Sequence, residues 1–312
     1  MSTSLQGSLS ASSVSKRQEA AQREREEDEE EEELAPVTLD EILEFKSQLS
    51  APLQDSGVWY LVILSALVSC HAGAECVVHV YEQLLREAGV SASPNTSDGN
   101  DAGIQNGKSG DGQRFREKSL ELQRRIQELL VKGSVIYGIP GSLDTMFTLL
   151  SHLRRQRSDA EQQGQGHVPL LTASDFSRHH LLSEPLSSLT QGAEEALRRV
   201  YQHNLDEILA SRMSENMQDL RFLTLEINYG FTLANQAIID WKHSELVLLS
   251  ALIPQRNCTN EIKWHLRGAA RAGWSLDDIA SLRSTAIRIA RRCGYRLSKI
   301  PSLQDVSENS ND

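Results

Sequence analysis

The sequence lacks an excess of positive charge, the feature by which general nucleic-acid-binding proteins are recognised. Its formal net charge is −11, and much of the negative charge falls in one acidic run, residues 24–33. This composition argues against a basic nucleic-acid-binding face. We therefore expect no nucleic-acid partner.

Long apolar runs are also missing. The longest, Val58–Cys70, is too short to span a bilayer, and the polar residues His71 and Glu75 follow it closely. No N-terminal hydrophobic signal precedes it. The run predicts a buried helix, and we expect no membrane partner.

Cysteine is scarce, and the four present form no C-x-x-C pair and no spacing typical of a zinc site. We therefore expect reduced thiols in an intracellular protein, with no metal and no cofactor. The final residues, 309–312, do not form a peroxisomal Ser-Lys-Leu-type signal. The sequence alone therefore predicts a cytoplasmic location.

Shifts in composition divide the chain into helical and non-helical parts. Apolar residues recur at helical spacing and nowhere alternate with a period of two, which predicts an all-α fold. The predicted parts are a disordered acidic tail (1–36), a first helical repeat (37–155) with a flexible insertion (90–114), a linker (156–188), a second helical repeat (189–300) and a tail (301–312).

Two phrases occur in both helical repeats. Leu61–Leu67 reads Leu-Val-Ile-Leu-Ser-Ala-Leu, and Leu246–Leu252 reads Leu-Val-Leu-Leu-Ser-Ala-Leu. A Glu-x-x-x-His motif follows each of them, at Glu75 in the first repeat and at Glu261 in the second. We interpret the two repeats as divergent copies of one unit, called here the first copy (37–155) and the second copy (189–300).

The second copy has the more complete set of chemically active residues. On a helix, Cys258, Glu261 and His265 occupy positions i, i+3 and i+7, which places them along one stripe. A carboxylate beside an imidazole can make it a proton donor or acceptor, and a cysteine beside it can become reactive. The alternative is a surface Glu–His pair and a small buried cysteine, and spacing alone leaves both open. Glu245 is an unexpected acid at the head of an apolar helix.

These residues resemble a known family. Glu245–Val247, Glu261–Gly273 and Ser275–Ile279 are similar, in order and spacing, to the carboxymuconolactone decarboxylase family, which includes the alkylhydroperoxidase D-like proteins. Leu61–Gly89 and Val135–Gly141 resemble the same family. The resemblance implies two all-helical repeats packed as a pseudo-dimer, and assembly as a homo-oligomer.

The resemblance also implies a chemistry. The peroxidase branch of the family uses two thiols, but Glu261 occupies the position of the second one, which favours the decarboxylase branch. The implied site comprises catalytic Glu245, Cys258, Glu261 and His265, with Trp264 and Arg267 binding the substrate. The first copy retains Glu75 and His79 but has Tyr60 in place of the leading acid, so we expect those residues to be structural.

Three functions remain open from the sequence. The first is a decarboxylase-like enzyme with an acid–base pocket that acts on a small organic acid or lactone. The second is an antioxidant protein that uses one cysteine, Cys258. The third is a non-catalytic helical scaffold.

Overall fold

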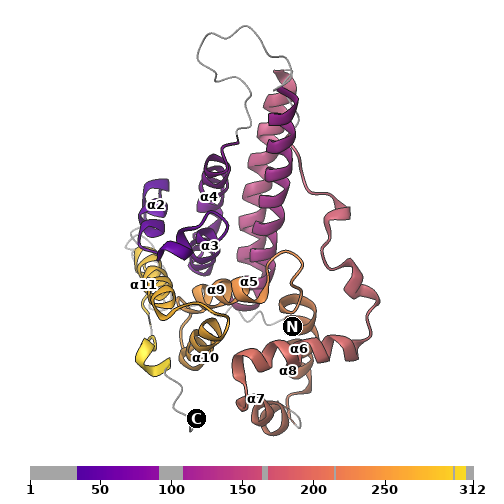
Figure 1. Cartoon of the computed structure of the whole chain (residues 1–312), viewed down its shortest axis with the longest axis vertical. Helices are drawn as coiled ribbons and strands as arrows, with labels where there is room; N and C mark the ends of the chain where they lie inside the picture. The colour runs from indigo at the N-terminus through magenta and orange to yellow at the C-terminus, as the bar shows by residue number, and fades with distance from the viewer. Residues whose placement is uncertain (1–33, 91–107, 164–167, 214–215, 298, 307–312) are drawn as a thin grey trace, which may run out of the picture. The chain divides into compact units, whose positions relative to one another are not determined.

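The computed structural model describes residues 34–90, 108–163, 168–213, 216–297 and 299–306. Within these ranges the chain forms ten α-helices with short 3₁₀ and π segments and no strand (Figure 1). The all-α prediction is confirmed for the described residues. Most of the predicted disordered tail and of the predicted insertion lies outside them, and the insertion's last residues, 108–114, begin a helix.

The first copy opens with three helices, α2 (Leu39–Ser47), α3 (Trp59–Ser69) and α4 (Gly73–Glu87). A capping box starts α2, because the Glu41 amide donates to Thr38 Oγ1 at 3.3 Å and the Thr38 amide donates to Glu41 Oε2 at 2.9 Å. Every residue of α3 is buried. The apolar run therefore forms a core helix, as the sequence predicts.

The next element, α5 (Lys108–Gln162), reverses its direction at Gly138. Gly138 has φ 81° and ψ 173°, a conformation open essentially only to glycine. Beyond it, Ser142 Oγ donates to the Leu130 carbonyl at 3.2 Å. In a straight helix these residues would lie about 18 Å apart. The element is thus a helical hairpin, and it continues past residue 155, where the sequence predicted its end.

Both arms of the α5 hairpin pack on α4. In the first arm, Ser119 Oγ shares a 2.7 Å hydrogen bond with the Tyr81 hydroxyl. In the second arm, His152 Nε2 lies 2.8 Å from Glu82 Oε1. Tyr81 and Glu82, which are adjacent on α4, therefore bind opposite arms of the α5 hairpin.

The predicted linker is shorter than expected and is held against the helices. It contains two 3₁₀ turns, η2 (Ala173–Asp175) and η3 (His179–Ser183). Between them, Arg178 makes two 2.8 Å hydrogen bonds to the buried Glu128 carboxylate of α5. Arg178 Nη2 also donates to the Thr232 carbonyl at 2.9 Å.

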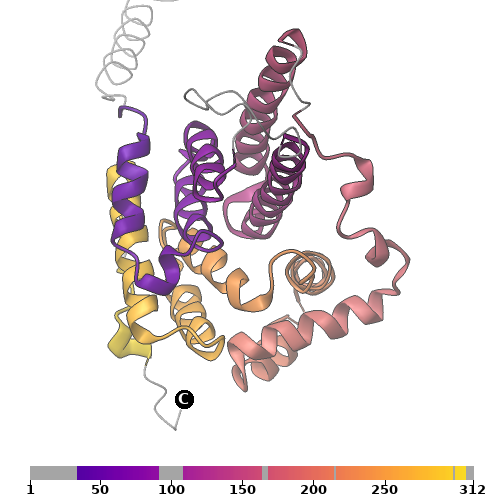
Figure 2. The ribbon, with the colours of Figure 1, turned by 45° about the horizontal axis from the view of Figure 1, so that its top comes forward.

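The second copy contains the remaining helices. They are α6 (Leu186–Tyr201), α7 (Asn204–Glu207), the π-helix η4 (Ile208–Met213), α8 (Gln218–Phe222), the π-helix η5 (Leu223–Leu233), α9 (Trp241–Leu252), α10 (Thr259–Arg271) and α11 (Leu276–Arg292). Between α7 and α9 the chain forms α8 and then η5, which ends at Leu233. Figure 2 shows α6 beside α10, and the two helices pack together.

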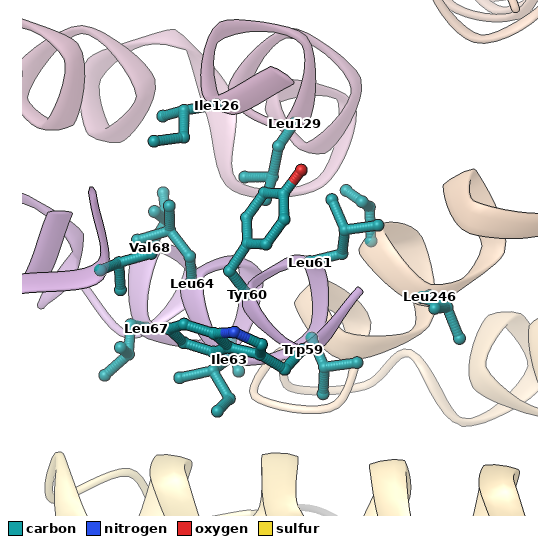
Figure 3. Packing of buried hydrophobic residues seen from close by; sticks show 14 of the residues in the cluster. Trp59, Tyr60, Leu61, Ile63, Leu64, Leu67, Val68, Ile126, Leu129 and Leu246 are labelled. Atoms are coloured by element: carbon teal, nitrogen blue, oxygen red, sulfur yellow. The ribbon is translucent and has the colours of Figure 1, made fainter. Parts of the chain in front are cut away.

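The repeated apolar phrases meet at the centre of the molecule. Helices α3 and α9 pack on each other, and Ser69 Oγ donates to the Ala251 carbonyl at 2.6 Å. Figure 3 shows the side chains of α3 beside Ile126 and Leu129 of α5, and Leu246 of α9 belongs to the same cluster. Residues of both predicted copies belong to one core, and the described residues from Pro36 onwards form a single compact unit.

A smaller apolar cluster lies apart from this core. It contains Ala193, Leu197, Leu205 and Leu225, from α6, α7 and η5. Among the described residues, no helix has both the length and the apolar content needed to cross a bilayer.

Candidate functional site

Glu245 of α9 and His265 of α10 meet in the interior. His265 Nδ1 lies 2.9 Å from Glu245 Oε2, and the two residues are 3% and 1% exposed. When the carboxylate is ionised, Nδ1–H donates to it, which leaves Nε2 as the ring's reactive nitrogen. We call this pair the dyad.

Three neighbours place the Glu245 carboxylate. Asp240 caps α9 by accepting the His243 amide at 2.9 Å, which sets the start of the helix. One helical turn before Glu245, Trp241 Nε1 donates to Glu245 Oε1 at 3.2 Å. On α10, a Cβ added to Gly268 would lie 2.7 Å from Glu245 Oε2, so the absence of a side chain there makes room for the carboxylate.

Two tyrosines, Tyr201 at the end of α6 and Tyr229 in η5, cover the dyad. We call the elements α6 and η5 the covering layer. The Tyr229 hydroxyl lies close enough to that of Tyr201 to affect its pKa, and the Tyr201 ring packs on Trp264 with centroids 4.8 Å apart. Burial raises the pKa of Tyr201 to about 12, and the charge of Glu261 and then Glu245 adds to the rise. Burial also raises the pKa of Tyr229 well above its ordinary value. Both hydroxyls therefore keep their protons at neutral pH.

The dyad lies between the two apolar clusters. Leu246 and Leu266, the neighbours of Glu245 and His265 in sequence, belong to the main core. Tyr201, in the covering layer, packs against the smaller cluster instead. A boundary between two packed units is a place where small-molecule sites commonly form.

The dyad is closed in this structure. Three surface hollows of about 370, 170 and 280 Å³ are lined by residues of other parts of the fold. Neither Glu245 nor His265 lines any of the three. Because both dyad residues are almost fully buried, a substrate can reach them only after neighbouring side chains move.

Cys258 and Glu261 do not join the dyad. Cys258 precedes α10, and its thiol lies 3.5 Å from the Arg256 carbonyl. Burial, and then the charge of Glu261, raises the pKa of this thiol. Cys258 is about 10 Å along the helix axis from His265. Among the described residues, His265 is hydrogen-bonded to Glu245 and not to its helix neighbour Glu261.

The predicted substrate-binding residues lie in different places. Trp264 packs on Tyr201 at the border of the site. Arg267 is buried, and because residues two apart on a helix do not face each other, it leaves α10 in another direction than His265. The guanidinium of Arg199 lies 5.4 Å from the centroid of the Trp241 ring, and Trp241 in turn donates to Glu245.

The first copy has no equivalent of the dyad. Glu75 and His79 are both exposed on α4. Tyr60, at the position that matches Glu245, is fully buried, and its hydroxyl accepts a 2.6 Å hydrogen bond from Arg125 Nε. In the described part of the chain, no cluster of three or more His, Cys, Asp or Glu side chains is placed to hold a metal ion.

Sequence reasoning missed four residues of the site: Trp241, Gly268, Tyr201 and Tyr229. Trp241 carried a signal, because it precedes Glu245 by four residues and so faces the same side of a helix. The tyrosines had no such signal, since their position depends on how the covering layer folds over α10.

Comparison with known proteins finds distant relatives. No family model matches the sequence, and no solved structure matches it. Peroxisomal protein 2 of Schizosaccharomyces pombe is 21% identical over 172 residues, which cover 55% of this chain and 71% of that protein. Peroxisomal protein 2 of Saccharomyces cerevisiae is 22% identical over 185 residues, 56% of this chain and 63% of that protein.

Proposed function

We propose that this protein is a carboxymuconolactone decarboxylase-like enzyme that transfers a proton to or from a small organic acid or lactone at the Glu245–His265 dyad. The buried contact between the two side chains carries the proposal. Burying an ionisable pair is costly unless the pair is well hydrogen-bonded, so such a pair is weak evidence for a purely stabilising role. Its position between two apolar clusters supports a binding function.

In the proposed reaction, Glu245 holds Nδ1–H of His265 and so fixes which ring nitrogen reacts. The scissile C–C bond of the substrate acid breaks, CO₂ leaves, and the electron pair spreads into the neighbouring carbonyl group. Protonated Nε2 then delivers its proton to that carbon, forming the new C–H bond. The protonated hydroxyl of Tyr201 or Tyr229 would donate to the carbonyl oxygen.

The charge around the dyad suits an anionic substrate. Arg199 is exposed and lies over Trp241, which itself contacts Glu245, so a carboxylate approaching the dyad from this side meets a guanidinium first. We therefore propose Arg199, in addition to the Arg267 expected from the family resemblance, as a group that holds the substrate carboxylate.

The scaffold hypothesis is the second candidate, and the closed covering layer favours it. The antioxidant hypothesis loses support, because a reactive cysteine needs a lowered pKa and the pKa of Cys258 is raised. A homo-oligomer, expected from the family resemblance, remains part of the proposal.

We also propose a peroxisomal location, because both relatives are named as peroxisomal proteins. This replaces the cytoplasm expected from the sequence alone. A fluorescent fusion should coincide with a peroxisomal marker in cells, and a diffuse signal throughout the cytosol would contradict the proposal.

The test of the activity uses the full chain and a panel of small carboxylated lactones, with CO₂ release as the readout. His265→Gln and Glu245→Gln should each lower turnover by about 100-fold or more, the range expected for loss of acid–base catalysis. Circular dichroism should show that both variants remain helical.

His79→Gln and Glu75→Gln are matched controls, since these residues are the exposed counterparts in the first copy. They should leave turnover unchanged. The enzyme hypothesis would be abandoned in favour of the scaffold if the His265→Gln variant kept full turnover, or if the native protein neither bound nor converted any lactone of the panel.

A further inference from the structure

Helices α3 and α11 end in matching ways. Cys70 is the cap residue at the end of α3, and Cys293 is the cap residue at the end of α11. Each cysteine is followed by a residue in the left-handed conformation, His71 with φ 60° and Gly294 with φ 78°. The chain therefore turns away directly after each thiol.

The two ends lie against each other. The thiols of Cys70 and Cys293 each shift the pKa of the other, which places the two side chains close together. Independently of the sulfur atoms, the rings of His71 and Tyr295 lie near each other, tilted by 33° with centroids 6.4 Å apart. Both cysteines are free, Cys70 being buried and Cys293 partly exposed. Two reduced thiols at the adjoining ends of two packed helices are candidates for a disulfide.

We propose that Cys70 and Cys293 form a reversible redox pair that closes to a disulfide by exchange with a small-molecule disulfide of the glutathione type. The Cys293 thiolate attacks one sulfur of that molecule, so that a mixed disulfide forms and one thiolate leaves. Cys70 then loses its proton and attacks the Cys293 sulfur, which forms the intramolecular bond and releases the second thiolate. Two electrons pass from the protein to the small disulfide.

Charge and exposure assign the order of these steps. The hydrogen bond from Cys70, and then the Arg292 guanidinium, lower the pKa of Cys293 against the opposing effect of burial. The hydrogen bond with Cys293, and then burial, raise the pKa of Cys70. The thiol that a small molecule can reach is therefore also the one that ionises, and the buried thiol resolves the mixed disulfide.

The pair would join the first copy to the last helix of the second. The loop closed by the bond would contain roughly 220 residues, and long loops give the largest entropic stabilisation. This redox pair is independent of the dyad, because neither cysteine contacts Glu245 or His265 within the described residues.

The test equilibrates the full, folded chain with mixtures of reduced and oxidised glutathione, followed by alkylation and peptide mass mapping. We expect one cross-link, between the peptides that contain Cys70 and Cys293, and its loss when the reduced form is in excess. The melting temperature of the cross-linked protein should rise by about 5 °C or more.

The other two cysteines provide matched controls. Cys76→Ser removes a buried thiol near the pair, and Cys258→Ser removes the thiol before α10; both variants should still form the cross-link. Cys70→Ser should instead stop at a glutathione adduct on Cys293. The proposal is overturned if no 70–293 cross-link forms at any glutathione ratio, or if the native protein carries glutathione only on Cys258.

Discussion

At the scale of single residues, the dyad depends on a missing side chain. Gly268 faces Glu245 from α10, and any Cβ there would lie 2.7 Å from the carboxylate oxygen that accepts the His265 hydrogen bond. It would also lie 3.5 Å from Val200 Cγ1 of the covering layer. One glycine thus allows α9, α10 and α6 to approach the same carboxylate.

Gly268→Ala should therefore displace Glu245 and weaken its bond to His265. We expect a loss of about 1–3 kcal/mol in the free energy of unfolding, typical of added volume in a packed interior, together with reduced turnover. Urea denaturation measures the first effect, and the CO₂ assay measures the second.

Gly112→Ala is the matched control, because Gly112 is also helical but has no atom within 4 Å of its added Cβ. It should leave stability unchanged or raise it by about 0.5–1 kcal/mol. Equal effects of the two substitutions would show that crowding at Glu245 is not the cause.

The members of the dyad were predictable as residues but not as a pair. Glu245 stood out as an acid in an apolar helix, and His265 belonged to the repeated motif. The sequence suggested Glu261 as the carboxylate for His265 because it lies one turn away on the same helix. In the structure, the carboxylate bound to His265 is that of Glu245, twenty positions earlier in the chain. The packing of α9 on α10 decides between the two carboxylates, and no local pattern records it.

At the scale of elements, the Glu41 carboxylate takes part in the capping box of α2 and also binds α11. Glu41 accepts the Thr38 amide in the capping box, and it also accepts a 2.5 Å hydrogen bond from Arg292 Nε. Arg292, followed by Thr38, lowers the pKa of Glu41 to about 2. The first helix of the fold is thus held by an ionised group.

Acid should loosen α2 through Glu41. Because its pKa is lowered on folding, Glu41 contributes stability that is complete above its ordinary pKa of 4.5 and is lost as the pH falls towards 2. Hydrogen exchange at pH 5 and pH 3 should show α2 losing protection at the lower value. Glu41→Gln should be less protected at pH 5 and should respond less to acid.

Glu44→Gln is the control. Glu44 is also in α2 and also binds an arginine of α11, Arg288, but this ion pair is more exposed. It should change protection little. Identical acid responses of the native protein and the Glu41→Gln variant would rule out this role of Glu41.

Element boundaries followed local signals where such signals existed. Thr38 and Ser275 cap the starts of α2 and α11, and a glycine, Gly138, lies at the reversal of α5. The π-helix η5 was not foreseen, because hydrogen bonds from i to i+5 leave no recognised pattern in a sequence.

At the scale of the whole molecule, one guanidinium joins three distant parts of the chain. Arg178, in the linker, binds Glu128 of α5 and the carbonyl of Thr232 near the end of η5. Lys132 lies beside this group and donates to the Leu233 carbonyl at 2.8 Å. Burial lowers the pKa of Lys132 to about 8, which makes Arg178 the permanent cation of the group.

Arg178→Met should destabilise the protein strongly, because the buried Glu128 carboxylate would lose both of its short hydrogen bonds. Breaking a buried ion pair by removing one partner costs about 3–5 kcal/mol. Equilibrium denaturation in urea would measure this loss.

Arg124→Met removes a comparable ion pair with Asp175, but the Arg124 side chain is 40% exposed. It should cost at most about 1 kcal/mol. If both variants lost a similar free energy of unfolding, burial of Glu128 would not explain the effect of Arg178→Met.

The pairing of α3 with α9 has a consequence for synthesis of the protein. Helix α3 is wholly buried, yet its partner ends at Leu252, far later in the chain. At a translation rate of about 5–20 residues per second, roughly 10–40 s separate the two helices. During that time the eleven-residue segment of α3 has left the ribosome but cannot yet pack on α9. Until α9 emerges, α3 therefore lacks the helix that packs on it in the folded protein.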